Sequence, residues 1–207
     1  MIALIDYGAG NLASVRKALR ACGAELFEPA GADRLARASA IVLPGVGHFG
    51  ATRALDGAWR SAIRGRVEAG VPFLGICLGM QWLFEGSDEA PGTPGLGCLP
   101  GRVVRLPDRT EAGDRVKVPH AGWNTARALA GPGHEPGIPG LGDGAYFYFT
   151  HAYAAPVTAS AAAITEYGVA FASAVRRGHV CGVQFHPEKS GAAGLAVLRA
   201  FIEGTRS

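Results

Sequence analysis

The first half of the chain alternates short apolar segments with amphipathic ones, and this alternation limits the fold more than any other feature of the sequence. Apolar runs are typical of buried strands, and apolar residues at helical spacing are typical of covering helices. We expect strands at residues 2–5, 24–28, 40–43 and from 71 toward Cys77, with helices following Asn11, spanning Trp59, Ile63 and Val67, and following Cys77. Buried strands that alternate with helices predict a mainly parallel open sheet flanked by helices, an α/β fold.

The second half of the chain has a different pattern, with strand-like runs joined by short connections. We expect strands at residues 102–106, 116–118, 145–149, 161–165, 171–175 and 180–185, and a C-terminal helix over residues 192–203. Arg177-Gly178 is a plausible hairpin turn between the last two strands. This half therefore predicts an antiparallel section added to the parallel sheet.

The chain is expected to form a single domain over residues 1–207, because 207 residues suffice for one substantial core. Two segments rich in glycine and proline, residues 90–101 and 130–144, are interpreted as surface loops within that domain.

Composition excludes several classes of function. Hydrophobic residues make up 48% of the chain and charged residues 18%, with a formal net charge of +3, and the basic residues are dispersed. We therefore expect no nucleic-acid partner. No apolar run approaches a membrane span and the N-terminus does not resemble a signal peptide, so we expect no membrane association and a cytoplasmic location. The four cysteines lack metal-binding spacing, and we expect no metal site.

Cys77 is the residue that most directly indicates chemistry. It lies in Gly75-Ile76-Cys77-Leu78-Gly79, where an apolar strand is expected to turn sharply into a helix. Small residues on both sides suit a nucleophile elbow, in which larger side chains would clash. The N-terminus of the following helix would favour the reactive thiolate.

A base and an orienting group are present near the C-terminus, in His186-Pro187-Glu188. Proline biases His186 toward an extended conformation, so that His186 and Glu188 project to the same side. Glu188 could then bind one imidazole nitrogen while the other faces Cys77. We predict a Cys77, His186 and Glu188 triad at the carboxyl edge of the sheet. A serine triad is disfavoured because no serine occupies an equivalent turn.

A tetrahedral intermediate also needs N–H donors for its oxyanion. The N–H of Leu78 is one candidate. The glycine-rich turn Pro44-Gly45-Val46-Gly47 could supply the second donor through Val46 or Gly47, since glycine lets a peptide rotate.

These motifs resemble those of class I (triad) glutamine amidotransferases, which have a flavodoxin-like fold. The resemblance narrows to the glutaminase subunit of imidazole glycerol phosphate synthase, an enzyme of histidine biosynthesis, and it runs from the first strand to the last helix. The matching segments are residues 6–11, 44–47, 75–81, 118–124, 147–153 and 184–190.

The resemblance implies a reaction and a substrate. Cys77 would attack the side-chain amide of glutamine to form a thioester, His186 would shuttle the proton, and water would release glutamate. Gln81 and Glu89 would hold the two ends of glutamine, together with the backbone at Ala152 and Tyr153. His120 and His151 belong to motifs near the site and are expected to be hydrogen-bonded structural groups. No cofactor is implied.

The resemblance also implies a partner, a (β/α)8-barrel cyclase subunit in a heterodimer. The cyclase would take the ammonia through an internal tunnel and make imidazole glycerol phosphate and AICAR from PRFAR. Trp123, Tyr148 and Lys189 match interface positions. We expect the isolated subunit to be nearly inactive, with the turn at residues 44–47 holding its peptide away from the oxyanion until the cyclase binds its ligand.

Two departures from the family pattern stand out, namely Ala9 where some relatives carry proline and a long loop at residues 130–144. Two alternatives remain at this point. One is the glutaminase of another amidotransferase, such as anthranilate or aminodeoxychorismate synthase, which the motifs around Trp123 and His151 disfavour. The other is a non-catalytic binding module that kept the fold, which the intact triad disfavours.

Overall fold

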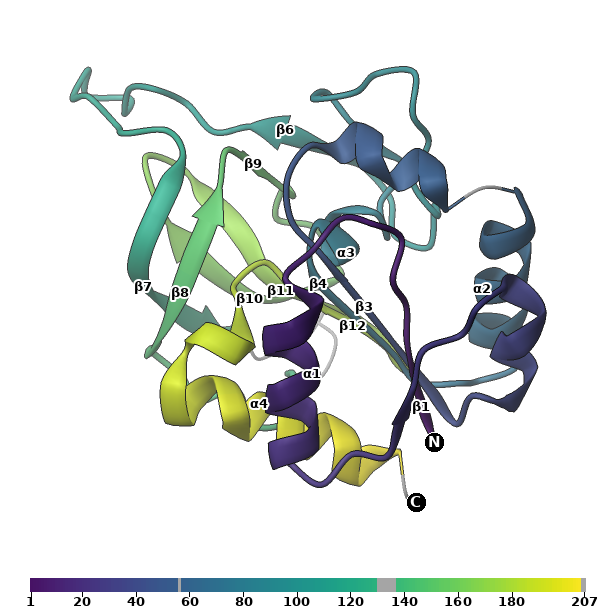
Figure 1. The fold of residues 1–207 in the computed structure, drawn as a ribbon. Helices are drawn as coiled ribbons and strands as arrows, with labels where there is room; N and C mark the ends of the chain where they lie inside the picture. Colours follow the sequence, from purple (N-terminus) through teal and green to yellow (C-terminus); the bar gives the residue numbers. More distant parts are fainter. Residues whose placement is uncertain (56, 130–136, 206–207) are drawn as a thin grey trace.

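A nine-stranded mixed sheet forms the centre of the protein, as seen in a computed structural model that describes residues 1–55, 57–129 and 137–205 (Figure 1). The strands follow the order β2-β1-β3-β4-β12-β11-β10-β7-β8. Their bounds are β1 Ile2–Leu4, β2 Leu26–Phe27, β3 Ala40–Gly45, β4 Phe73–Cys77, β7 His120–Ala128, β8 Ala145–His151, β10 Ala161–Glu166, β11 Ala170–Arg177 and β12 Val180–Val183.

The strands from β2 to β12 pair in parallel, and those from β12 to β8 pair antiparallel. The parallel half has the strand order of flavodoxin-like folds. A small second sheet joins β5 (Gly86–Ser87), β6 (Arg102–Arg105) and β9 (Tyr153–Ala154). The predicted fold class, a parallel sheet with an added antiparallel section, is confirmed.

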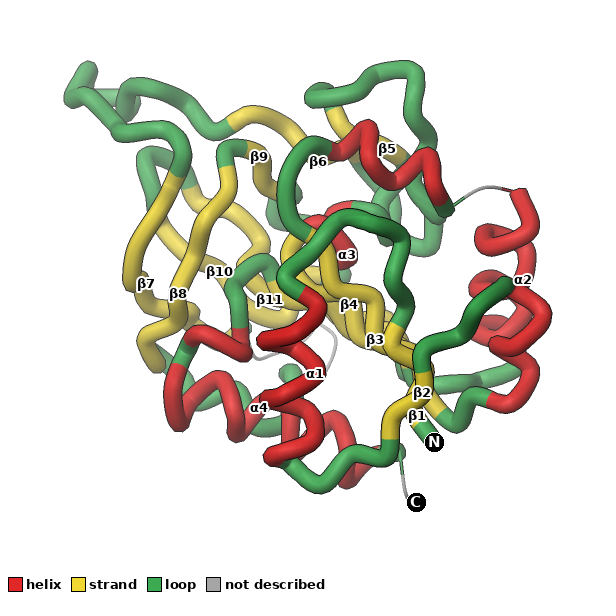
Figure 2. Tube along the Cα trace, in the orientation of Figure 1, coloured by secondary structure: helices red, strands yellow, loops and turns green. Residues whose placement is uncertain are grey.

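Helices cover both faces of the sheet (Figure 2). The helices α1 (Leu12–Ala21) and α4 (Gly191–Gly204) contact each other and contribute to one core. On the other face lie α2 (Gly57–Glu68), α3 (Leu78–Gln81) and the 3-10 turns η1 (Ala32–Arg37) and η2 (Phe49–Ala54), whose apolar residues form a second core. A third 3-10 turn, η3, spans Pro187–Lys189.

Local signals placed the ends of several elements correctly. The side chain of Asn11 accepts a hydrogen bond from the Ser14 amide and caps α1, as predicted. The helix ends before Gly23, which adopts a positive φ of 83°. The hairpin between β11 and β12 is also present, although Arg177 pairs with Val180 and the turn itself is Gly178-His179, one residue later than predicted.

The predicted strand at residues 116–118 is wrong. That segment is irregular, and the strand β7 begins only after it, at His120. Apolar and polar residues alternate in this segment, as they do in many strands. Among the described residues, however, the backbone N–H of Val116 bonds to the carbonyl of Asp108, which belongs to no strand. Alternation alone does not make a strand without a neighbouring strand to pair with.

The interpretation of residues 90–101 as a surface loop needs correction. The segment is irregular, but Leu96 and Leu99 are fully buried in the core with α3. Arg60 and Arg64 of α2 donate hydrogen bonds to carbonyl groups at Gly95 and Leu96. The side chains of this loop therefore complete one face of the core. The other predicted loop, residues 130–144, lies in part outside the described residues, and its described part includes the buried Ile138.

No helix in the described ranges is long and apolar enough to cross a membrane.

Candidate active site

Cys77 stands at a sharp turn between β4 and α3. Its backbone adopts φ 53° and ψ −108°, and it is the single non-glycine residue with positive φ in the described part of the chain. Residues without glycine's freedom adopt this conformation only when the surroundings enforce it, and such strain concentrates at functional sites. The neighbouring glycines Gly75 and Gly79 leave room for the turn. The predicted sharp turn from a strand into a helix at Cys77 is present, with the geometry of a nucleophile elbow.

The helix after Cys77 is shorter than predicted. It comprises Leu78–Gln81, and Leu83 and Phe84 lie beyond it in a turn. A single helical turn carries little of the macrodipole of a long helix. A dipole of this size is smaller than the one that the predicted longer helix would have supplied.

His186 and Glu188 lie together as the sequence predicted. His186 has an extended backbone, with φ −99° and ψ 95°, and its Nδ1 lies 2.9 Å from Glu188 Oε1. Both side chains are buried, with exposed fractions of 2% and 1%. Because a carboxylate only accepts hydrogen bonds, Nδ1 carries a proton and donates it to Glu188. The Nε2 atom has no hydrogen-bond partner among the described residues, so it is free to exchange a proton.

The environment of His186 favours its charged form. Burial lowers the pKa of His186, but its interactions with Cys77 and with Glu188 outweigh burial and raise the pKa to about 9. A cationic imidazole next to the sulfur is the arrangement that stabilises a thiolate.

Gln184 is a neighbour of Cys77 to which the sequence analysis gave no role. Its Nε2 donates a hydrogen bond to the Cys77 sulfur over 3.6 Å, and its Oε1 accepts one from Gln81 over 3.0 Å. The parallel register pairs Val183 with Ile76, so the next residues along β12 and β4, Gln184 and Cys77, come side by side. Strand order and register were the signals that would have identified it.

A small pocket of about 40 Å³ opens beside the sulfur. All the residues that the resemblance linked to the substrate or the oxyanion line it, together with Thr150 and His151. They are Gly47, Leu78, Gln81, Glu89, Ala152 and Tyr153. The fold thus gathers residues from four segments of the chain at one end of the parallel strands.

The glycine-rich turn approaches Cys77 from β3, since Gly45 pairs with Cys77 across the sheet. Gly47 has a positive φ of 94°, which requires glycine. The N–H of Val46 donates a long hydrogen bond of 3.4 Å to the Ala9 carbonyl, so this donor points to a different segment of the chain. Glu89 accepts a 2.6 Å hydrogen bond from the Phe49 amide just after the turn.

His120 and His151 form a buried pair behind the pocket. His120 Nδ1 lies 3.2 Å from His151 Nε2, and the His120 ring stacks between Phe149 and Tyr167. Burial lowers the pKa of His120 to about 4. Burial, followed by the proximity of His120, lowers the pKa of His151 to about 3. The prediction that these are hydrogen-bonded groups is confirmed, and both are neutral at pH 7.

Trp123, Tyr148 and Lys189 form a single surface cluster. Trp123 and Tyr148 face each other across β7 and β8, with ring centroids 6.1 Å apart, and Lys189 Nζ lies 5.7 Å from the centre of the Tyr148 ring. Trp123 is 57% exposed. An exposed tryptophan beside other aromatic and cationic groups is typical of a contact surface.

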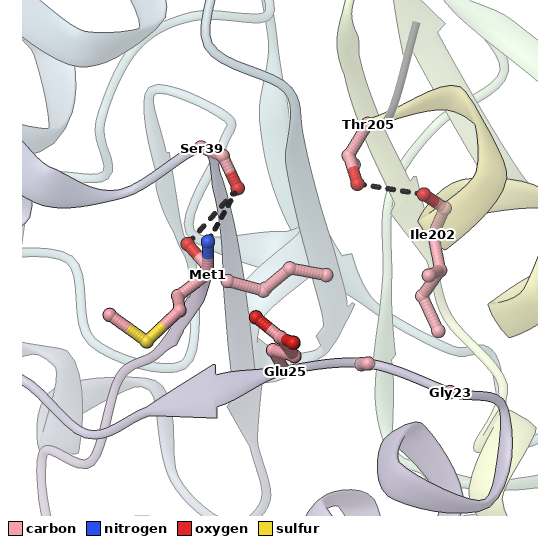
Figure 3. A pocket seen from close by; sticks show the side chains of 8 residues that line it. Met1, Gly23, Glu25, Ser39, Ile202 and Thr205 are labelled. Carbon is pink, nitrogen blue, oxygen red and sulfur yellow. Dashed lines mark hydrogen bonds between the residues drawn. The ribbon is translucent and has the colours of Figure 1, made fainter.

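A larger pocket, of about 350 Å³, lies at the opposite end of the parallel strands, near both ends of the chain (Figure 3). In its lining Ser39 bonds to Met1 and Thr205 bonds to Ile202, and Glu25 is a further polar residue. None of the predicted site residues lines this pocket, because they lie at the other end of the parallel strands. Across residues 1–55, 57–129 and 137–205 we find no group of three or more metal-ligating side chains.

The family of glutamine amidotransferases of class I matches residues 3–203 of the chain. Among solved structures, a crystal structure of a glutamine amidotransferase superposes with a TM-score of 0.74 at 21% identity, covering 100% of both chains. PurLQS from Thermotoga maritima gives a TM-score of 0.73 at 17% identity over 98% of this chain and 97% of that one. These two structures support the fold. The chain is a class I glutamine amidotransferase.

Its relatives by sequence indicate a more specific family within this class. Imidazole glycerol phosphate synthase subunit HisH of Deinococcus radiodurans is 45% identical, with 97% of this chain and 92% of that protein covered. The subunit of the same name from Methanothermobacter thermautotrophicus is 44% identical over the full length of both. Within the class, the chain belongs to the family of HisH subunits.

Proposed function

We propose that the chain is the glutaminase subunit of imidazole glycerol phosphate synthase, and that Cys77, His186 and Glu188 hydrolyse glutamine to glutamate and ammonia. The observation that carries this proposal is the buried hydrogen bond between His186 and Glu188 next to a thiol held at a strained turn. This combination meets the requirements for an activated cysteine nucleophile.

The reaction follows from the positions of these groups. The Cys77 thiolate attacks the side-chain carbonyl carbon of glutamine, and the negative charge moves to the carbonyl oxygen. The N–H groups of Leu78 and Gly47 are the donors for that oxygen. His186 then gives its Nε2 proton to the departing nitrogen, so ammonia leaves and a glutamyl thioester remains.

Hydrolysis of the thioester completes the cycle. His186, now neutral, accepts a proton from water as the water attacks the thioester carbonyl. The carbon–sulfur bond breaks, glutamate is released and the cysteine thiolate returns. Glu188 keeps the imidazole in the orientation that presents Nε2 at both stages. The sum is glutamine plus water giving glutamate plus ammonia, with no cofactor.

We assign the recognition of glutamine to the lining of the small pocket. Gln81 and Glu89 hold the α-amino and α-carboxylate ends, with the backbone at Ala152 and Tyr153. These residues line the same pocket as the Cys77 sulfur, which supports the assignment.

We assign the cluster of Trp123, Tyr148 and Lys189 to the contact with a (β/α)8-barrel cyclase in a heterodimer. The cyclase receives the ammonia through an internal tunnel and forms imidazole glycerol phosphate and AICAR from PRFAR. The named relatives are subunits of that synthase, which supports a partner for this chain. The reaction belongs to a cytoplasmic biosynthetic pathway, and residues 1–207 act as a single domain.

The glycine-rich turn is the proposed site of regulation. The N–H of Val46, which belongs to the preceding peptide, donates a long hydrogen bond to the Ala9 carbonyl and anchors the turn, and Gly47 supplies a backbone conformation that permits rotation of the next peptide. In this proposal the Val46-Gly47 peptide presents its N–H to the oxyanion only when a ligand-loaded cyclase is bound.

The decisive experiment measures glutamate release with and without the cyclase, for wild type and Cys77→Ala. We expect activity only in the wild-type complex with ligand-loaded cyclase. Cys77→Ala should abolish it and leave ammonia-dependent synthesis by the complex intact. Glutamate release by Cys77→Ala would remove the proposed nucleophile, and a wild-type complex without activity would favour a non-catalytic binding module.

A further inference from the structure

We propose that Gln184 is a positioning residue for the Cys77 sulfur, and that the Tyr153 carbonyl, acting through Gln81, fixes the orientation of its side-chain amide. The proposal deepens the proposed function, since it depends on Cys77 being the nucleophile. Gln184 is fully buried, and its backbone N–H bonds to the Ser173 carbonyl of the neighbouring strand β11. Its side chain lies between Gln81 and Cys77 and is hydrogen-bonded to both.

The direction of each hydrogen bond near the sulfur follows from one backbone carbonyl. The Tyr153 carbonyl can only accept, so the Gln81 atom that lies 2.8 Å from it is the amide nitrogen. The same nitrogen lies 3.0 Å from Gln184, so the Gln184 atom facing it is the oxygen. The remaining amide group of Gln184 is then the NH2, and it faces the Cys77 sulfur.

The same carbonyl also orders the two histidines. His151 Nδ1 lies 2.9 Å from the Tyr153 carbonyl and must donate to it, so His151 Nε2 is an acceptor. His120 Nδ1 therefore donates to His151 Nε2, and His120 Nε2 accepts from the Asn124 amide over 3.4 Å. Each bond in the chain fits only when both rings are neutral and carry their proton on Nδ1.

The arrangement has a chemical purpose at the sulfur. A thiolate accepts hydrogen bonds more strongly than a thiol does, so a buried N–H donor aimed at the sulfur favours the thiolate. The titratable groups around Cys77 are His186, with Glu188 behind it, Tyr7 of the turn after β1, and Glu89 and His151, which line the same pocket. Gln184 adds an uncharged donor to these groups, and the donor stays in place across the pH range in which His186 changes its charge.

The test is alkylation of Cys77 in the full-length chain by iodoacetamide, followed by peptide mass spectrometry across pH. This readout does not depend on glutaminase activity. Gln184→Glu retains the acceptor for Gln81 and replaces the donor with a carboxylate oxygen, while Gln184→Met removes both. We expect alkylation of Cys77 at pH 7 to slow at least tenfold in Gln184→Met, and to slow further in Gln184→Glu. In both variants the curve of alkylation rate against pH should shift to higher pH.

The matched control is Ser173→Ala. Ser173 is fully buried on the adjacent strand, and its hydroxyl has no hydrogen-bond partner in the described part of the chain. Its alkylation profile should remain that of wild type. Rates within twofold of wild type in both folded Gln184 variants would overturn the proposal. If the reactivity is as expected but the wild-type complex releases no glutamate, the positioning role stands and the proposed function fails.

A second measurement needs no variant at all. Nitrogen-15 NMR of the imidazole rings reports which nitrogen carries the proton. We expect His120 and His151 to be neutral and protonated on Nδ1 at pH 7. Protonation on Nε2 of either ring would reverse a hydrogen bond and contradict the order of donors and acceptors that we derive from the Tyr153 carbonyl.

Discussion

Gly75 and Gly79 pack directly against each other beneath Cys77, so closely that a Cβ atom on Gly75 would lie 2.6 Å from the carbonyl carbon of Gly79. A Cβ on Gly79 would in turn collide with the Leu43 carbonyl oxygen of β3. Strand β4, helix α3 and strand β3 therefore meet at a distance that only glycine allows. The strained turn at Cys77 depends on this contact.

We predict that Gly79→Ala lowers the free energy of unfolding by at least about 3 kcal/mol, because rigid backbone has to shift. The control is Gly65→Ala in the exposed part of α2, where an added Cβ meets no atom within 4 Å. That change should raise stability by about 0.5–1 kcal/mol, because alanine favours a helix. Urea denaturation measures both. Equal effects of the two substitutions would show that the packing under Cys77 is loose.

The charge on His186 predicts a loss of stability in alkali. Its pKa in the folded protein is about 9, above the ordinary value for histidine, so its contribution is complete below about pH 6.5 and disappears as pH rises through 9. Glu188→Gln retains the shape of the acceptor and removes its charge. We expect it to cost on the order of 1–3 kcal/mol at pH 6 and much less at pH 10. Urea titrations at both pH values measure the difference, and an equal cost at both would contradict the assignment.

His120 and His151 predict the opposite behaviour in acid. Their pKa values in the folded protein, about 4 and about 3, lie below the ordinary value. The unfolded chain therefore binds protons on these residues first, and stability falls as pH drops from about 6.5 toward 4. His186 opposes this slope near pH 6.5, where the unfolded chain is still taking up its proton, and adds nothing below about pH 5.5, where it is charged in both states. We expect His120→Gln to reduce the slope of unfolding free energy by about 1.4 kcal/mol per pH unit. An unchanged slope between pH 6.5 and 5 would show that His120 is not buried in its neutral form.

The exposed Trp123 predicts a role in binding and none in folding. We expect Trp123→Ala to weaken association with the cyclase by tenfold or more, because aromatic anchors carry much of the energy of such interfaces. Its unfolding free energy should stay within about 0.5 kcal/mol of wild type, since the side chain is 57% exposed.

Calorimetric titration of the cyclase measures this affinity. Glu203→Ala is the control, because Glu203 is exposed on the last turn of α4. Its neighbours Ile202 and Thr205 line the pocket at the opposite end of the parallel strands from Cys77. If both substitutions weaken binding equally, the aromatic cluster is not the interface.

Sequence alone predicted the parallel half of the fold because its strands are continuous buried apolar runs. It missed β7, where only His120 and Ala126 are buried and glycine, asparagine and threonine interrupt the pattern. The sharp turn at Cys77 and the contact between His186 and Glu188 could be predicted because each residue carries a local signal, such as flanking glycines or an adjacent proline. The contact between Gln184 and Cys77 could not, because it depends on β12 lying next to β4 in a particular register.

Tyr148 belongs to two parts of the molecule at once. Its ring forms the surface cluster with Trp123, while its backbone carbonyl accepts a 2.9 Å hydrogen bond from the His186 N–H and its N–H donates to Ser190 Oγ. Ser190 in turn donates to the His186 carbonyl. Position 148 therefore meets two separate requirements. A change of its side chain would alter the surface cluster and leave the His186 backbone in place, whereas a shift of its backbone would move His186 directly.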